Sequence, residues 1–67
     1  MPRSAAAQKV LEAMSSAQVA LDEYRADFTS DTGFAKLIGH HELKKLIHQY
    51  EQFIDSSYKM LLDHGLI

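Results

Sequence analysis

The last third of the chain carries an apolar stripe that is too wide for one neighbouring helix to cover. Between residues 43 and 61, apolar side chains recur at helical spacing in three adjacent heptad rows, whereas packing on a single helix needs about two. The stripe consists of Leu43, Leu46, Ile47, Tyr50, Phe53, Ile54, Met60 and Leu61, with Ser57 in the same rows. We therefore expect a long helix over about residues 41–64, ending before Gly65, that contacts more than one partner element.

A narrower stripe marks the first part of the chain, over about residues 4–28. Its apolar positions alternate steps of three and four, which is the a/d pattern of a helix packed along one other helix. They are Ala7, Val10, Met14, Ala17, Leu21, Tyr24 and Phe28. Ser4 stands where an N-cap residue is expected, because its hydroxyl can accept a free backbone N–H of the first turn. The pattern predicts a first long helix that starts at Ser4.

The segment between the two stripes predicts a connection with a short helix of its own. The turn-forming sequence TSDTG, residues 29–33, is followed by the apolar residues Phe34, Leu37 and Ile38, and either Ser30 or Asp31 could cap a helix that holds them. Phe34 and Ile38 would fall on the polar side of the final helix if that helix extended backwards, and Gly39 costs about 1 kcal/mol inside a helix. We predict a short helix over 31–38 and a turn at 39–40, with one continuous helix bent at Gly39 as the alternative.

These elements predict an all-α fold, an antiparallel helical hairpin with a short connecting helix, formed by residues 1–67 as one small domain. Two helices enclose little interior, and a core of this size supplies only about 3 to 5 kcal/mol without a disulfide or metal. The chain has no cysteine. We therefore expect the hairpin to dimerise into a four-helix bundle or to lie on a larger protein.

The predicted partner-binding residues are the apolar side chains that packing between the two helices of the hairpin would leave uncovered. They are Leu46, Phe53 and Met60 in the third row of the last helix, and Phe34, Leu37 and Ile38 in the connection. Tyr24, Tyr50 and Phe53 also have a spacing that a cofactor site could use, but regular spacing is typical of core packing. The predicted function is a small protein–protein interaction module, an adaptor, chaperone-like subunit or inhibitor.

Composition argues against several other classes of function. The net charge is −2 and the seven Lys and Arg residues are scattered, so we expect no nucleic-acid binding. No apolar run approaches the ~20 residues of a membrane span, and Gln8, Lys9 and Glu12 interrupt any secretory signal segment near the start. We expect a cytoplasmic protein that is not an enzyme, with no cofactor and no small-molecule substrate.

The segment HHELKKLIH, residues 40–48, concentrates the histidines. Two histidines on one helix share a metal ion at i,i+3 or i,i+4 spacing. His40 and His41 instead diverge by about 100°, and His41 and His48 are two turns, or ~10 Å, apart. Only Glu51 stands three residues from His48, which leaves a site short of ligands. We predict no metal site.

The tetrapeptide His41-Glu42-Leu43-Lys44 resembles the phosphoacceptor box of the dimerisation domain of sensor histidine kinases, a helical hairpin that pairs into a four-helix bundle. The His-x-Leu-Lys pattern is also similar to that of histidine phosphotransfer domains. The resemblance implies His41 as phosphoacceptor, with Lys44 or Lys45 offsetting phosphoryl charge. The chain departs from both families at Lys45 and Leu46, where the kinases have a proline nearby and the phosphotransfer domains a glycine. A phosphoacceptor module that uses His41 is thus the alternative function.

Overall fold

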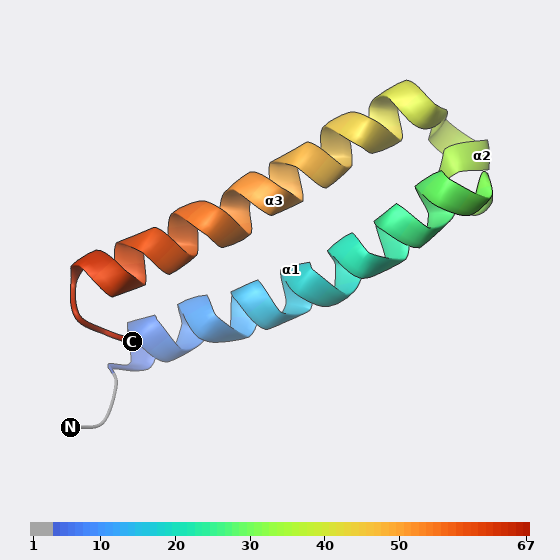
Figure 1. Cartoon of the computed structure of the whole chain (residues 1–67). Coiled ribbons are helices and arrows are strands. Elements are labelled where there is room, and N and C mark those ends of the chain that lie inside the picture. The colour runs from blue at the N-terminus through green and yellow to red at the C-terminus, as the bar shows by residue number, and fades with distance from the viewer. Residues whose placement is uncertain (1–3) are drawn as a thin grey trace.

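A computed structural model describes residues 4–67 as two long helices joined by a short one (Figure 1). Helix α1 spans Ala5–Ser30, α2 spans Phe34–Ile38 and α3 spans His40–Asp63. α1 and α3 lie side by side and antiparallel, with α2 at one end and the start of α1 and the C-terminus at the other (Figure 1). The predicted all-α hairpin with a connecting helix is confirmed, while residues 1–3 of the predicted domain lie outside the described residues.

Local side-chain and backbone caps fix the ends of α1. Ser4 is the N-cap, as predicted, and its Oγ accepts the N–H of Ala7 at 3.0 Å. At the other end the helix runs two residues beyond the expected limit of 28. Asp31 adopts the left-handed conformation with φ 55°, so that its N–H and that of Thr32 both reach the carbonyl of Asp27. A short Asx side chain tolerates this conformation better than most residues, which explains why the helix ends here.

The start of α2 corrects one prediction, because neither Ser30 nor Asp31 caps it. The N-cap position is Gly33, and Phe34 gives its backbone N–H to Oδ2 of Asp27 at 3.1 Å. The capping carboxylate therefore comes from the last turns of α1, seven residues back along the chain. Asp31 is instead needed to end α1, and α2 begins at residue 34 rather than 31.

Gly39 separates α2 from α3, where the sequence phases disagree. Its φ of 85° and ψ of 157° are not helical, and they belong to a region that glycine enters far more readily than other residues. The N–H of Gly39 donates to the carbonyl of Ala35 at the end of α2. The carbonyl of Gly39 accepts the N–H of Leu43 in the first turn of α3. The two helices are thus distinct, and the turn is confined to Gly39, since His40 already belongs to α3.

The C-terminal end of α3 forms a Schellman motif. The N–H of Leu66 bonds to the carbonyl of Leu61 at 2.9 Å, and the N–H of Gly65 bonds to that of Leu62 at 3.1 Å. Gly65 has φ 67°, which agrees with its predicted place just after the helix. Half-buried Leu66 then follows the last turn of the helix.

The core of the hairpin is one side chain thick. The buried apolar residues are Ala7, Ala17, Leu21, Ala35, Leu43 and Leu61, of which only Leu43 and Leu61 are fully enclosed. The molecule measures 46 × 16 × 14 Å, and its radius of gyration of 14.5 Å exceeds the roughly 11 Å of a compact chain of this length. Within residues 4–67, no helix combines the length and apolar content that crossing a bilayer requires. The rod leaves much of its apolar surface uncovered.

Candidate interaction surface

The hairpin has two long sides with different chemistry. Gln49 and Glu51 stand about 200° apart around α3, so they point to opposite sides. Gln49 lines two of the hollows on one side, which we call the open face. Arg25 and Glu51 both line two hollows on the other, which we call the bridged face.

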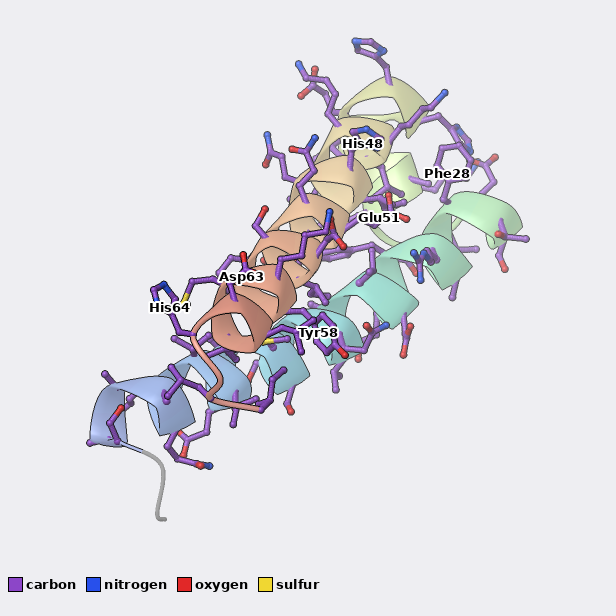
Figure 2. The ribbon with its side chains drawn as sticks, turned by 60° about the vertical axis from the view of Figure 1, so that its left-hand side comes forward. Phe28, His48, Glu51, Tyr58, Asp63 and His64 are labelled. Carbon is purple, nitrogen blue, oxygen red and sulfur yellow. The ribbon has the colours of Figure 1, made fainter. Side chains whose placement is uncertain are left out.

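An ion pair crosses the bridged face. Nη2 of Arg25 on α1 lies 2.6 Å from Oε2 of Glu51 on α3, and Nδ1 of His48 lies 3.6 Å from the other oxygen of Glu51. Figure 2 shows His48, Glu51 and Tyr58 following one another along α3 on this side, with Phe28 on the neighbouring α1. The long polar side chains divide this face into two hollows of about 350 and 360 Å³. Such a divided, charged surface is typical of a solvated side.

The open face holds a groove of about 460 Å³ between α1 and α3, larger than either hollow of the bridged face. From α3 it is lined by Gln49, Tyr50 and Phe53, and from α1 by Ala13, Ser16, Ala17 and Ala20. No charged residue lines it, and α1 contributes nothing larger than serine. The side chain of Phe53 is part of the wall, yet the residue remains 45% exposed. A groove of this kind is apolar, open and bounded by one bulky side chain.

The predicted contact row on α3 lies along this face. Leu46, Phe53 and Met60 stand at seven-residue intervals and therefore on one side of the helix. Leu46 is half-buried and lines the second hollow of the face with Ile38, whereas Phe53 and Met60 are 45% and 40% exposed. Nothing within residues 4–67 covers these side chains completely. The structure thus gathers three predicted residues, Ile38, Leu46 and Phe53, around the two hollows that share Gln49.

The other predicted residues of the connection are placed differently. The ring of Phe34 packs against Tyr24 with centroids 5.4 Å apart, so it closes the end of the hairpin. Leu37 is 76% exposed at the tip of the rod, and it makes the least contact with the hairpin of the six predicted residues. These two side chains belong to the end of the molecule rather than to the groove.

Of the α1 side of the groove, the sequence pattern indicated Ala17 but not Ala13, Ser16 or Ala20. Ala6, Ala13 and Ala20 also recur every seven residues, and this spacing was the available indication of a second row. These side chains are small, so they do not stand out as an exposed apolar surface in the sequence. The contact of Tyr24 with Tyr50 and the ion pair of Arg25 with Glu51 fix the register of the helices. In that register Ala20 lies within about one turn of the level of Phe53.

Tyr24 and Tyr50 form the aromatic contact that sets this register. Their rings meet edge to face with centroids 5.3 Å apart, an arrangement that aromatic pairs favour. The pKa of Tyr24 is raised above its ordinary value of 10.0, first by side-chain hydrogen bonding with Tyr50 and then by desolvation and nearby charge. The regular spacing of these two residues serves helix packing, as the sequence indicated, whereas Phe53, the third residue of that spacing, remains 45% exposed.

The histidines occupy three different environments. His41 is exposed in the first turn of α3, and its imidazole makes no hydrogen bond or ion pair with residues 4–67. His40 places Nε2 3.4 Å from Oδ1 of Asp31, and its ring meets Phe28 edge-on at 5.0 Å. His48 faces Glu51. Across the described part of the chain, no three acidic or histidine side chains gather into a metal site.

Comparison of the chain with protein-family models, with curated proteins and with solved structures finds no match. The functional argument therefore depends on the geometry of the hairpin alone.

Proposed function

We propose that the protein is a non-catalytic protein–protein interaction module, an adaptor, chaperone-like subunit or inhibitor, whose contact surface is the open face. It pairs through this face into a four-helix bundle or lies on a larger protein. Apolar contact is the means of binding, so the proposal includes no cofactor, metal, nucleic acid, membrane or small-molecule substrate. A cytoplasmic location remains a prediction from the sequence.

The observation that carries the proposal is the exposure of Phe53 beside an uncharged groove. Complete burial of a phenylalanine side chain contributes about 1.5 to 3 kcal/mol relative to exposure. The hairpin leaves this contribution partly unused at Phe53, and again at Met60 one heptad later. A partner that covers both side chains and fills the groove would recover it.

The total surface of the chain supports the same interpretation. Its accessible area is 4876 Å², whereas a compact monomer of its 7.6 kDa exposes about 4,300 Å². The excess of roughly 600 Å² approaches the ~800 Å² that each partner buries in an interface of standard size. The hairpin therefore exposes more accessible surface than a compact domain of its mass, and the excess is close to the area that one interface would bury.

A matched pair of charge substitutions on α3 tests the proposal. Phe53→Asp would place an unpaired carboxylate in the interface, whereas Tyr58→Asp changes a similarly exposed aromatic residue on the bridged face. Binding is measured as self-association by sedimentation equilibrium and as retention of cellular proteins on the immobilised chain. Circular dichroism of both variants checks that the helices persist.

We expect Phe53→Asp to abolish binding and Tyr58→Asp to preserve it. If the Phe53→Asp protein remains helical and binds as the wild type does, the open face is not the contact surface. Equal loss in both helical variants would also contradict the assignment, because it would show no preference for one side.

A second candidate function is phosphoacceptance by His41, favoured by the exposure of its imidazole and its lack of an ion-pair partner within residues 4–67. Lys44 and Lys45 stand in the following turn. Incubation with a small-molecule phosphodonor should then give an acid-labile phosphate that disappears in His41→Ala and persists in His48→Ala. Absence of acid-labile phosphate on the wild-type chain would rule this function out for that class of donor.

A further inference from the structure

We infer that the occupant of the open face is a second copy of this chain, related to the first by a two-fold axis parallel to the long axis of the hairpin. The inference rests on the proposed function and specifies its partner. In this arrangement α3 of each copy lies over α1 of the other, and the four helices form one bundle. Each α2 connector then lies at the same end of the assembly.

Two orientations would bury the open face symmetrically, and the side-chain sizes select one of them. An axis perpendicular to the hairpin would lay α3 on α3 and set the bulky row of Leu46, Phe53 and Met60 against itself. An axis parallel to the hairpin keeps every residue at its own level and sets this row against α1 of the partner. The facing row of α1 carries alanines, so large side chains meet small ones, as close packing requires.

The groove is the receiving site for Phe53 in this arrangement. Phe53 lies nearly level with Ala20, and both line the same groove of about 460 Å³ in one hairpin. A two-fold axis along the rod keeps this level, so it brings the partner's Phe53 close to Ala20, at one end of the α1 side of the groove. The partner's groove receives Phe53 of the first copy by the same operation, so the interface is isologous and closed.

Charged residues stand beyond both ends of the groove. Lys9 near the start of α1 and Asp63 near the end of α3 lie at one end of the hairpin. At the other end the carboxylate of Asp27 caps α2, and Nζ of Lys45 lies 3.4 Å from Oε1 of Glu42. Between them, Ala13, Ser16 and Ala20 leave the centre uncharged. An apolar centre within a charged rim is the usual anatomy of a protein interface.

The extent of the hairpin is compatible with an interface of standard size. One whole side of the rod, 46 Å by 16 Å in outline, is of the same order as the ~800 Å² that each partner buries in such an interface. All neighbouring helices in the resulting bundle would be antiparallel, because α1 and α3 already run in opposite directions and α3 faces α1 of the partner. Up-and-down bundles of this kind are a standard packing of four helices.

One spin label per chain distinguishes this arrangement from its alternatives. The sequence has no cysteine, so Leu37→Cys provides a single attachment point at the exposed tip of the rod. The distance between the two labels is measured by pulsed electron paramagnetic resonance, and the mass by light scattering over a range of concentrations. We expect twice the 7.6 kDa of one chain and labels within two hairpin widths, each 14–16 Å.

The other outcomes overturn the inference in separate ways. A dimer whose labels are about one rod length apart, near 46 Å, would show that the two-fold axis is perpendicular to the hairpin. The open face would still be the contact surface in that case. A chain that stays monomeric at every concentration would exclude the second copy. The partner in the proposed function would then be a larger protein. Retention of such a protein by the immobilised wild-type chain, and its loss with Phe53→Asp, would test the proposed function independently of the dimer.

A second pair of variants tests the receiving groove itself. Ala13→Arg adds a long charged side chain to the lining of the groove from an exposed position, and Ala26→Arg adds the same side chain at an exposed position that does not line it. We expect at least a tenfold weaker dimer for Ala13→Arg, unchanged association for Ala26→Arg, and full helix content in both. Wild-type association of a helical Ala13→Arg protein would exclude the groove as the receiving site.

Discussion

The carboxylate of Asp27 fills the space where a side chain on Gly33 would stand. Oδ2 of Asp27 accepts the N–H of Phe34 at 3.1 Å, and a Cβ added to Gly33 would overlap that carboxylate. Gly33 also has φ 54°, which favours glycine. The carboxylate cap and the bare backbone therefore depend on each other, and together they hold α2 against the end of α1.

This dependence predicts a non-additive pair of substitutions. Gly33 has ψ −123°, outside the left-handed helical region, and Gly33→Ala should lower the free energy of unfolding by more than the ~1 to 3 kcal/mol of such a strained backbone, because the cap is displaced as well. Asp27→Ala removes the same cap and should cost about 1 kcal/mol. In the double variant the overlap is relieved, so the combined loss should be smaller than the sum, as urea unfolding of the four proteins would show. Strict additivity would mean that the cap and the glycine are independent.

The ion pair across the bridged face should contribute little to stability. Arg25 and Glu51 are 2.6 Å apart, but their side chains are 48% and 40% exposed, so solvent screens the attraction. A double-mutant cycle with Arg25→Ala and Glu51→Ala should give a coupling free energy of about 0.2 to 1 kcal/mol that falls as salt is added. A coupling that is larger, or unchanged at high salt, would contradict this expectation.

Gly39 should be harder to replace than Gly65. An alanine at either position meets no neighbouring atom within 4 Å, so any cost comes from the backbone alone. Gly39 has φ 85° and ψ 157°, a strained region in which a side chain costs of order 1 to 3 kcal/mol, whereas φ 67° at Gly65 suits the ordinary left-handed cap. Thermal unfolding should show the larger loss for Gly39→Ala. Equal losses would indicate that α2 and α3 readjust around residue 39.

The raised pKa of Tyr24 predicts weaker folding in strong alkali. The folded state holds the phenol proton more tightly than the unfolded state, so between the two pKa values it binds more protons and stability falls as pH rises. The contribution is complete below about pH 10 and is lost as pH rises through the folded pKa. Unfolding of Tyr24→Phe should therefore depend less steeply on pH above 10 than that of the wild type. Tyr58→Phe serves as the control, and the same slope in all three proteins would contradict the assignment.

The sequence predicted the helices well because each of them carries its own evidence. The three-four spacing from Ala7 to Phe28, the wide stripe from Leu43 to Leu61, and the phase break at Gly39 are all local patterns. Ser4 and Gly65 also stand at the positions that their conformational preferences suggest. The fold of a hairpin follows directly from these features, since two long amphipathic helices with a short connection have one simple way to pack.

The details that the sequence did not reveal depend on contacts between elements. Asp27 caps a helix seven residues away, and this capacity becomes apparent only once α1 has turned back at Asp31. Ala13 and Ala20 of the groove were missed because their importance lies in the space that they leave beside Phe53. A small side chain leaves space for a groove only where a neighbouring helix forms the other wall, and the sequence of one helix does not show that wall.

The seven-residue period of the two stripes has a consequence for the shape of any partner. A straight α-helix drifts by about 20° per heptad against such a period, so over the three heptads from Ala7 to Phe28 the drift reaches roughly 60°. Helices that keep these rows in contact must wind around each other with a left-handed twist. The row of Leu46, Phe53 and Met60 then follows a shallow spiral, and a flat surface would touch its middle and separate from both ends. Only a partner that winds with the same hand can follow the whole row.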